Sequence, residues 1–443
     1  MDGRLCHIRR VMDRIERHIL SRRALLRRGL AGMATALVTP AFIGCDDDPM
    51  RVDAGGGLDA GGALDAGGGV DAGPAEFPVR DIPAPAPLNS LIADIGPLGD
   101  PDAEGLRLPA GFTGRKLATS GEMVAGTDYE WHQAPDGGAT FATEDGGWIY
   151  VCNSEVPIIG GVGAMRFDAS GSLVDAYRTL ERSNINCAGG PTPWHTWLSC
   201  EERAQGLVFE TDPWGEVSAI ERPALGVFKH EAVCVDPERW HLYLSEDEGD
   251  GGFYRFRPAG MNAAGFPDLT AGALEIAEVA ADGAVTWHEV PDPSNTSGTS
   301  VRNQVAAATR FDGGEGIWYH DGVVYLSTKG DTRVWAYDVV AQSIAVLYDG
   351  EAIMDPPLTG VDNVVVSCCG DVLVAEDGGS MQIVAILPSG ELKPLVQVTG
   401  QDDSEITGPA FDPSGTRLYF NSQRGTTGSG FTYEITGPFH EPA

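Results

Sequence analysis

A recurring sequence unit constrains the fold of this chain more than any other feature. The unit is a short strand that opens on a small or acidic residue, a turn, a second apolar strand, and then Ser, Asn or Cys before a polar or acidic group. Its copies are 136–155, 187–202, 231–247, 315–330, 362–377 and 407–423. Their first residues are 51, 44, 84, 47 and 45 positions apart. Periods of 40 to 50 residues in an all-β chain predict β-propeller blades of four strands.

The number of copies predicts an all-β propeller with six blades, with seven as the alternative. The one long interval contains no further copy of the unit, so we expect an insertion at about residues 258–300 rather than a missing blade. Beyond about residue 80, apolar residues alternate or run in fours and fives between Gly, Asp-Gly and Pro-Ser-Gly turns, which is typical of short strands.

The first residues of the copies predict a functional site. In a propeller, the innermost strands all begin at the same end of the central channel, so these residues should form a ring around one mouth. They are Asp136, Cys187, Glu231, Glu315, Asp362 and Thr407. A ring of carboxylates repels itself unless cations neutralise it. Carboxylates suit calcium, whereas a thiolate among them suits zinc or iron.

The N-terminal segment has the pattern of an export signal. Ser21-Arg22-Arg23 opens a twin-arginine motif, an uncharged apolar stretch follows, and Gly44-Cys45 ends a sequence similar to a lipobox. We therefore expect a signal peptide at 1–44, export by the twin-arginine route, and a lipid on Cys45 that anchors the protein to the cell envelope, facing the periplasm or the surface. Repeated Asp-Ala-Gly-Gly units predict a disordered Gly/Asp/Ala-rich tether at 45–78, before a propeller domain at 79–443.

The charge of the chain excludes one class of binding partner. After residue 44 the chain carries 21 basic and 61 acidic side chains, a net charge of −40. A nucleic-acid partner is excluded because phosphates would be repelled.

Six cysteines remain after Cys6 and Cys45, and the sequence does not determine how they pair. We expect Cys368 and Cys369 to lie in a strand and to face opposite sides.

Several of these segments resemble a known family. The stretch from Asn186 to Glu202 reads NCAGGPTPWHTWLSCEE. With it come 228–233 (FKHEAV), Glu315-Gly316, 361–363 (VDN), 375–378 (AEDG) and 407–409 (TGP). Together they resemble the PhoX-type alkaline phosphatase family over about residues 80–435. The resemblance implies a six-bladed propeller that hydrolyses phosphate monoesters with iron and calcium.

The same resemblance implies roles for individual residues. Cys187 would be the iron-binding thiolate, and Glu202, Glu231, Glu315 and Asp362 would be metal ligands. Lys229 would contact the phosphate of a small phosphorylated substrate. A cluster of cations would neutralise that phosphate and lower the pKa of an oxygen nucleophile.

The chain departs from the family pattern at two places. His195 stands where the family usually has Gly, which would put a bulky side chain next to the site. Gly313-Gly314 stands where the family tends to supply a phosphate-binding arginine, and Arg310 is the nearest arginine in the sequence.

Two other functions agree with the sequence. Val361-Asp362-Asn363 is also similar to calcium-dependent sugar lactonases, and an envelope-anchored propeller that binds metal without catalysis is the third reading. The sequence determines neither the substrate, nor the metals loaded, nor which membrane holds the lipid, nor the oligomeric state.

Overall fold

The computed structural model describes residues 77–426 and 428–443 of the chain. The predicted signal peptide, Cys45 and nearly all of the predicted tether lie outside these residues. Within the described part, no helix is long and apolar enough to cross a membrane. The helices there are 3₁₀ turns: η1 (Ile92–Asp94), η2 (Pro223–Leu225), η3 (Val301–Asn303) and η4 (Gly350–Ala352).

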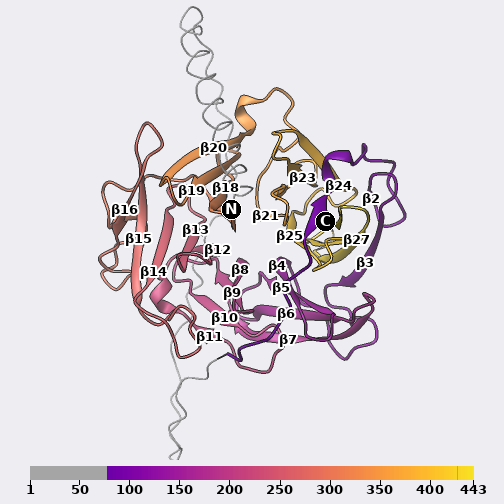
Figure 1. The fold of residues 1–443 in the computed structure, drawn as a ribbon, viewed down its shortest axis with the longest axis horizontal. Coiled ribbons are helices and arrows are strands. Elements are labelled where there is room, and N and C mark those ends of the chain that lie inside the picture. The colour runs from indigo at the N-terminus through magenta and orange to yellow at the C-terminus, as the bar shows by residue number, and fades with distance from the viewer. Residues whose placement is uncertain (1–76, 427) are drawn as a thin grey trace, which may run out of the picture. The chain divides into compact units, whose positions relative to one another are not determined.

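Six antiparallel sheets surround a central channel, which confirms the all-β propeller with six blades (Figure 1). The first two blades consist of β4 (Pro135–Ala142), β5 (Trp148–Ser154), β6 (Gly160–Phe167) and β7 (Leu173–Ser183), then β8 (Asn186–Pro191), β9 (Trp197–Glu201), β10 (Val208–Thr211) and β11 (Ile220–Glu221). The next two consist of β12 (His230–Asp236), β13 (His241–Glu246), β14 (Phe253–Pro258), β15 (Gly272–Val279) and β16 (Val285–Glu289), then β17 (Gly314–His320), β18 (Val323–Thr328), β19 (Arg333–Asp338) and β20 (Ser343–Asp349).

The last two blades take their outermost strands from the beginning of the described chain. The fifth consists of β21 (Val364–Val366), β22 (Val372–Ala375), β23 (Gln382–Ile386), β24 (Leu392–Val398) and β2 (Leu106–Arg107). The sixth consists of β25 (Ile406–Phe411), β26 (Arg417–Ser422), β27 (Phe431–Thr436) and β3 (Thr113–Thr119). A separate pair, β1 (Leu88–Ser90) and β28 (His440–Pro442), joins the two ends of the described chain. Strands from both ends therefore close the ring of blades.

The long interval in the repeat has a structural explanation. It holds β15 and β16, the fourth and fifth strands of the third blade, together with the loop before β15. The interval therefore enlarges one blade and does not replace a seventh.

Apolar side chains from adjacent blades form the core. Every residue of β5 is buried, because both faces of the blade pack against neighbouring blades. Tyr150 of the first blade stacks on Tyr419 of the sixth, with ring centroids 5.1 Å apart. Such a pair contributes about 0.5–1.5 kcal/mol beyond the burial of its area. This packing fixes the positions of the inner strands, which carry the predicted site.

Candidate metal centre

A β-bulge near the start of the inner strand positions the ring residue in four blades. At each bulge, two residues of the inner strand face one residue of the next strand, and the ring residue is the first of the two. These ring residues are Asp136, Cys187, Glu231 and Glu315. Bulges turn side chains out of the regular alternation of a strand. Asp362 precedes β21, where its backbone N–H donates to the Ala375 carbonyl at 3.0 Å.

Polar side chains of the preceding blade hold the backbone of several ring residues. The Asn153 amide donates to the Cys187 carbonyl at 3.1 Å, and the Asn421 amide donates to the Asp136 carbonyl at 2.8 Å. The Ser245 hydroxyl donates to the Glu315 carbonyl at 2.5 Å. These donors are Ser and Asn residues near the ends of three copies of the sequence unit. They link one blade to the next and fix the directions of the ring side chains.

The structure brings all five predicted metal-ligand residues together. Ligand atoms of Cys187, Glu202 and Glu231 lie within 4.8 Å of one another. The same holds for Glu231, Glu315 and Asp362. Glu231 belongs to both groups, so its carboxylate lies between the thiol and the other two carboxylates. This arrangement can hold more than one cation.

Glu231 is a buried acid that lacks a protein partner. Its side chain is fully buried, and neither carboxylate oxygen has a hydrogen bond. Burial, followed by the neighbouring Glu315 and Glu202 charges, raises the pKa of Glu231 well above its usual range. Buried charges in folded proteins are paired or bind metals. The unpartnered carboxylate therefore fits a bound cation.

The other acids of the ring are also buried next to like charges. Burial is the largest cause that raises the pKa values of Asp136, Glu315 and Asp362 well above their usual range, and neighbouring carboxylates add to it. Burial also raises the pKa of Glu202 to about 7, although Lys229 opposes the shift. Burial and then Asp136 raise the pKa of the Cys187 thiol. In the absence of bound cations, burial therefore favours the protonated forms of these groups.

Three cationic side chains surround the carboxylates. Lys229 Nζ lies 2.9 Å from Glu202 Oε1 and 2.9 Å from Asp247 Oδ2. Lys329 Nζ lies 2.7 Å from Glu315 Oε1 and also contacts Asp247. Arg424 forms ion pairs with Glu155 and Glu405. These cations neutralise the outer acids, whereas the fully buried Glu231 has no such partner.

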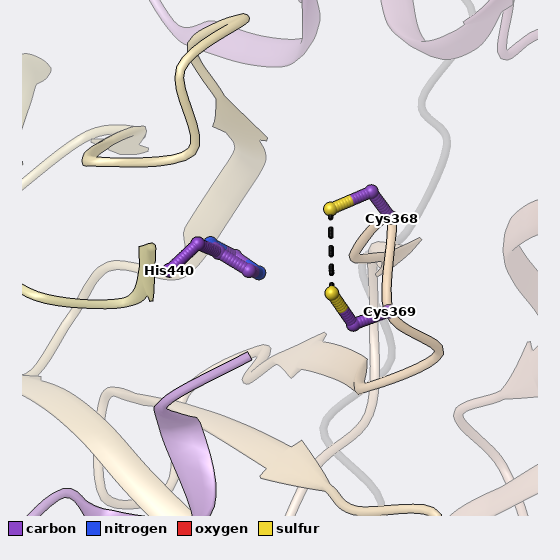
Figure 2. A group of neighbouring side chains, drawn as sticks. All are labelled: Cys368, Cys369 and His440. Atoms are coloured by element: carbon purple, nitrogen blue, oxygen red, sulfur yellow. Dashed lines mark hydrogen bonds between the residues drawn. The ribbon is translucent and has the colours of Figure 1, made fainter. Parts of the chain in front are cut away.

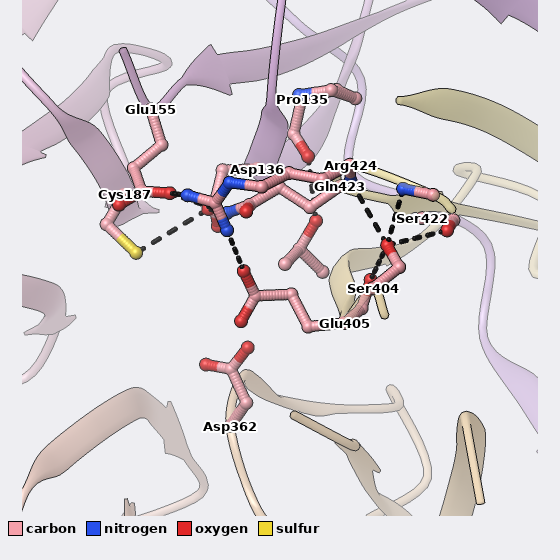
Figure 3. A network of polar contacts seen from close by, with 12 residues as sticks. Pro135, Asp136, Glu155, Cys187, Asp362, Ser404, Glu405, Ser422, Gln423 and Arg424 are labelled. Atoms are coloured by element: carbon pink, nitrogen blue, oxygen red, sulfur yellow. Dashed lines mark hydrogen bonds and ion pairs between the residues drawn. The ribbon is translucent and has the colours of Figure 1, made fainter. Parts of the chain in front are cut away.

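A cavity of about 300 Å³ opens at this mouth of the channel. Cys187, Glu202, Glu315 and Asp362 line it together with Lys329 and Arg424, and further polar groups complete its wall. Figure 3 shows Arg424 between Glu155 and Glu405, with Asp136, Cys187 and Asp362 around it. The cavity therefore combines ligands for cations with cationic groups suited to an anion.

One sequence expectation about the surroundings of the site was wrong. His195 lies in the turn between β8 and β9, at the opposite end of β8 from Cys187, and not next to the site. Its φ of +67° explains why Gly suits that position. Arg310 donates to the Arg302 carbonyl at 2.6 Å and to Asn303 at 2.8 Å, so its guanidinium is held away from the cavity.

Sequence reasoning missed a second group of acids. Ligand atoms of Asp136, Glu155 and Glu405 lie within 4.8 Å of one another. Burial raises the pKa of Glu405 to about 8. Asp136 and Glu155 begin and end the first copy of the repeat, so the repeat contained a signal for both. Glu405, Lys329 and Arg424 follow no such pattern and appear only when the blades are placed in three dimensions.

Comparisons with known proteins give one family match and several structural likenesses. Residues 160–344 match the family model described as alkaline phosphatase PhoX. No curated protein matches the chain. PhoX from Pseudomonas fluorescens, solved in complex with vanadate, a transition state analogue, is 16% identical, covers 80% of this chain and 98% of its own, and has a TM-score of 0.64. A gluconolactonase from Xanthomonas campestris is 13% identical, with coverage of 83% and 99% and a TM-score of 0.43.

The structural likeness at 16% identity shows a common fold. The family match runs from the start of β6 into β20 and includes Cys187, Glu231 and Glu315. Residues 160–344 of the chain are therefore similar in sequence to the PhoX alkaline phosphatase family.

Proposed function

We propose that this protein is a metal-dependent hydrolase of phosphate monoesters. The observation that carries the proposal is the buried Glu231 carboxylate, whose two oxygens have no hydrogen bond and which lies near one thiol and three further acids. Cys187, Glu202, Glu231, Glu315 and Asp362 would hold iron and calcium. Bound cations would supply charge that neutralises the phosphate dianion and would lower the pKa of an oxygen nucleophile.

The protein groups would bind and orient the substrate. Lys329 and Arg424 line the cavity, and Lys229 lies close to Glu202. Each already pairs with carboxylates, so a phosphate that approaches bound cations can accept hydrogen bonds from groups that are held in place. The guanidinium of Arg424 can grip two phosphate oxygens at once.

Turnover of p-nitrophenyl phosphate by the full chain, loaded with iron and calcium, tests this function. We expect turnover over the alkaline range and a loss of about 100-fold or more in Cys187→Ser, since removal of one metal ligand weakens both metal binding and charge stabilisation. Cys200→Ala is the matched control, because Cys200 is a buried thiol in the core around β9. Absence of turnover in the metal-loaded wild type from pH 5 to 10 would contradict the proposal.

We also propose that the protein is exported by the twin-arginine route and anchored through lipid on Cys45. The twin-arginine and lipobox-like sequences support this location. Cell fractionation tests it, because Cys45→Ser should move the protein from the membrane fraction to the soluble fraction. An unchanged membrane fraction would contradict the anchor.

A further inference from the structure

A second group of metal-binding side chains lies away from the acidic mouth. Cys368 and Cys369 occupy the turn between β21 and β22, and His440 is the first residue of β28. Asp362 lies two residues before β21, whereas this turn follows β21, so the two groups lie at opposite ends of the inner strand of the fifth blade. Figure 2 shows the His440 ring directed toward the two cysteines.

The expectation that both cysteines lie in a strand and face opposite sides was wrong. Their sulfur atoms are 3.5 Å apart, on the same side of a tight turn. The Ser367 hydroxyl holds this turn, since it accepts from the backbone N–H groups of Cys369 at 3.2 Å and Asp371 at 3.1 Å. The turn therefore presents two thiols in one direction without a disulfide between them.

His440 completes the group with a free ring nitrogen. Its side chain is only 4% exposed, and Nδ1 lies 2.8 Å from the Gly415 carbonyl oxygen. A carbonyl can only accept, so Nδ1 carries the proton and Nε2 presents its lone pair. Nε2 is buried and has no hydrogen-bond partner. A backbone carbonyl behind the ring is the usual support for a histidine that binds a metal through its other nitrogen.

One His440 nitrogen and the two sulfur atoms lie within 4.8 Å of one another. We propose that Cys368, Cys369 and His440 bind one thiophilic metal ion, either Cu(I) or Zn(II). Two thiols and an imidazole select these ions over calcium or magnesium, which prefer oxygen ligands. Cys368 is exposed, so a metal can enter from solvent and a water can serve as a fourth ligand for zinc.

The bound ion would connect parts of the chain that are distant in sequence. Cys369 Sγ contacts the Leu88 carbonyl of β1 at 3.3 Å, and β1 pairs with β28 through Ser90 and His440. The ion would therefore tie the turn of the fifth blade to the strand pair that joins the two ends of the described chain. Occupancy should stabilise the fold, because the metal binds only when these segments are together.

Alkylation of the cysteines in the reduced, metal-free full chain tests this site without a mutation. Modification of Cys368 and Cys369 is followed by mass spectrometry, with Zn(II) or Cu(I) titrated separately under anaerobic conditions. We expect one equivalent of metal to slow alkylation of both residues by about tenfold or more, because a coordinated thiolate is no longer a free nucleophile. The metal ion that protects the cysteines at the lower concentration is the one that the site prefers.

Variants give an independent measurement. Cys368→Ser with Cys369→Ser, and separately His440→Gln, should each bind one equivalent less zinc or copper than the wild type, and phosphatase turnover should stay unchanged. Cys200→Ala, a thiol outside both groups, should keep the wild-type stoichiometry. Unprotected cysteines at saturating metal, or a Cys368–Cys369 disulfide that persists under reductant, would overturn the proposal.

Discussion

Carboxylate oxygens of Glu231 and Glu315 lie within 4.8 Å of each other, and both side chains are buried. They occupy equivalent bulges at the start of β12 and β17, the inner strands of the third and fourth blades. Two like charges at this distance repel strongly in a buried environment. The mouth can therefore hold either protons or cations on these groups, and its stability should depend on which it holds.

Replacement of Glu231 should have opposite effects on the stability of the metal-free and the metal-loaded protein. In metal-free protein, Glu231→Gln should raise the free energy of unfolding by about 1–3 kcal/mol at pH 8, because the neutral amide needs no proton to be buried whereas the Glu231 carboxyl does. In metal-loaded protein, the same change should lower Tm because a ligand is lost. Denaturant unfolding with and without metal measures both effects. Glu391→Gln, at a side chain that is 58% exposed, should change neither, and equal effects of the two variants would argue against a buried metal ligand.

The metal-free protein should lose stability as pH rises. The pKa values of Glu202 and Glu405 are raised to about 7 and about 8, and burial raises the pKa values of the ring acids well above their usual range. An acid whose pKa is raised by folding keeps its proton in the folded state at a pH at which it is already ionised in the unfolded chain. The folded state therefore binds more protons. Stability is then fully present below about pH 4.5 and falls as pH rises through the folded values.

Thermal unfolding from pH 4.5 to 9 in chelator measures this slope. Saturating calcium and iron should reduce it or reverse its sign, because metal binding takes the place of proton binding. A Tm of the chelated protein that rises over this range would contradict raised pKa values at the mouth.

Arg424 should strengthen phosphate binding. Arg424→Ala should raise the inhibition constant of inorganic phosphate by about tenfold or more, since a hydrogen bond to a charged group contributes about 1.5–3 kcal/mol. The inhibition constant of Arg424→Lys should lie between those of the wild type and Arg424→Ala, because lysine keeps the charge but not the paired donors. Arg310→Ala is the control, as Arg310 bonds to the Arg302 carbonyl outside the cavity. Equal effects at both positions would remove the role assigned to Arg424.

Close contact between inner strands requires a residue without a side chain after Glu315. A Cβ on Gly316 would lie 2.3 Å from the Val364 backbone nitrogen. Gly316→Ala should lower the free energy of unfolding by about 1–3 kcal/mol through overpacking. Gly260→Ala should be nearly neutral, because a Cβ there meets nothing within 4 Å. Chemical denaturation of the two variants gives the comparison.

The fold could be predicted because the same short sequence pattern recurs in every blade. Each inner hairpin reads as two apolar strands around a turn, and all six copies coincide with inner hairpins of the structure. The long interval predicted an insertion at about residues 258–300, but not that β15 and β16 within it would join the third blade. The roles of β2 and β3 as outer strands of the fifth and sixth blades could not be predicted, because they pair with strands hundreds of residues away.

The site could be predicted where the repeat positions its residues. Strand order alone placed Cys187, Glu231, Glu315 and Asp362 at one mouth. It did not place Glu405 or Arg424, which enter the cavity from loops beside the sixth blade. It also misplaced His195, because closeness to Cys187 in sequence was mistaken for closeness in space across a hairpin. Cys368 and Cys369 were misjudged because a turn, and not a strand, holds them.

Elemental mass spectrometry of the full chain, purified beside Cys187→Ser, measures whether iron is bound at the Cys187 thiolate. We expect iron and calcium in the wild type, with iron lost and calcium kept in the variant, because only Cys187 supplies a thiolate to the predicted ligands. Calcium alone in both proteins would contradict the iron site at Cys187, and would favour a calcium-dependent lactonase or a metal-binding propeller without catalysis.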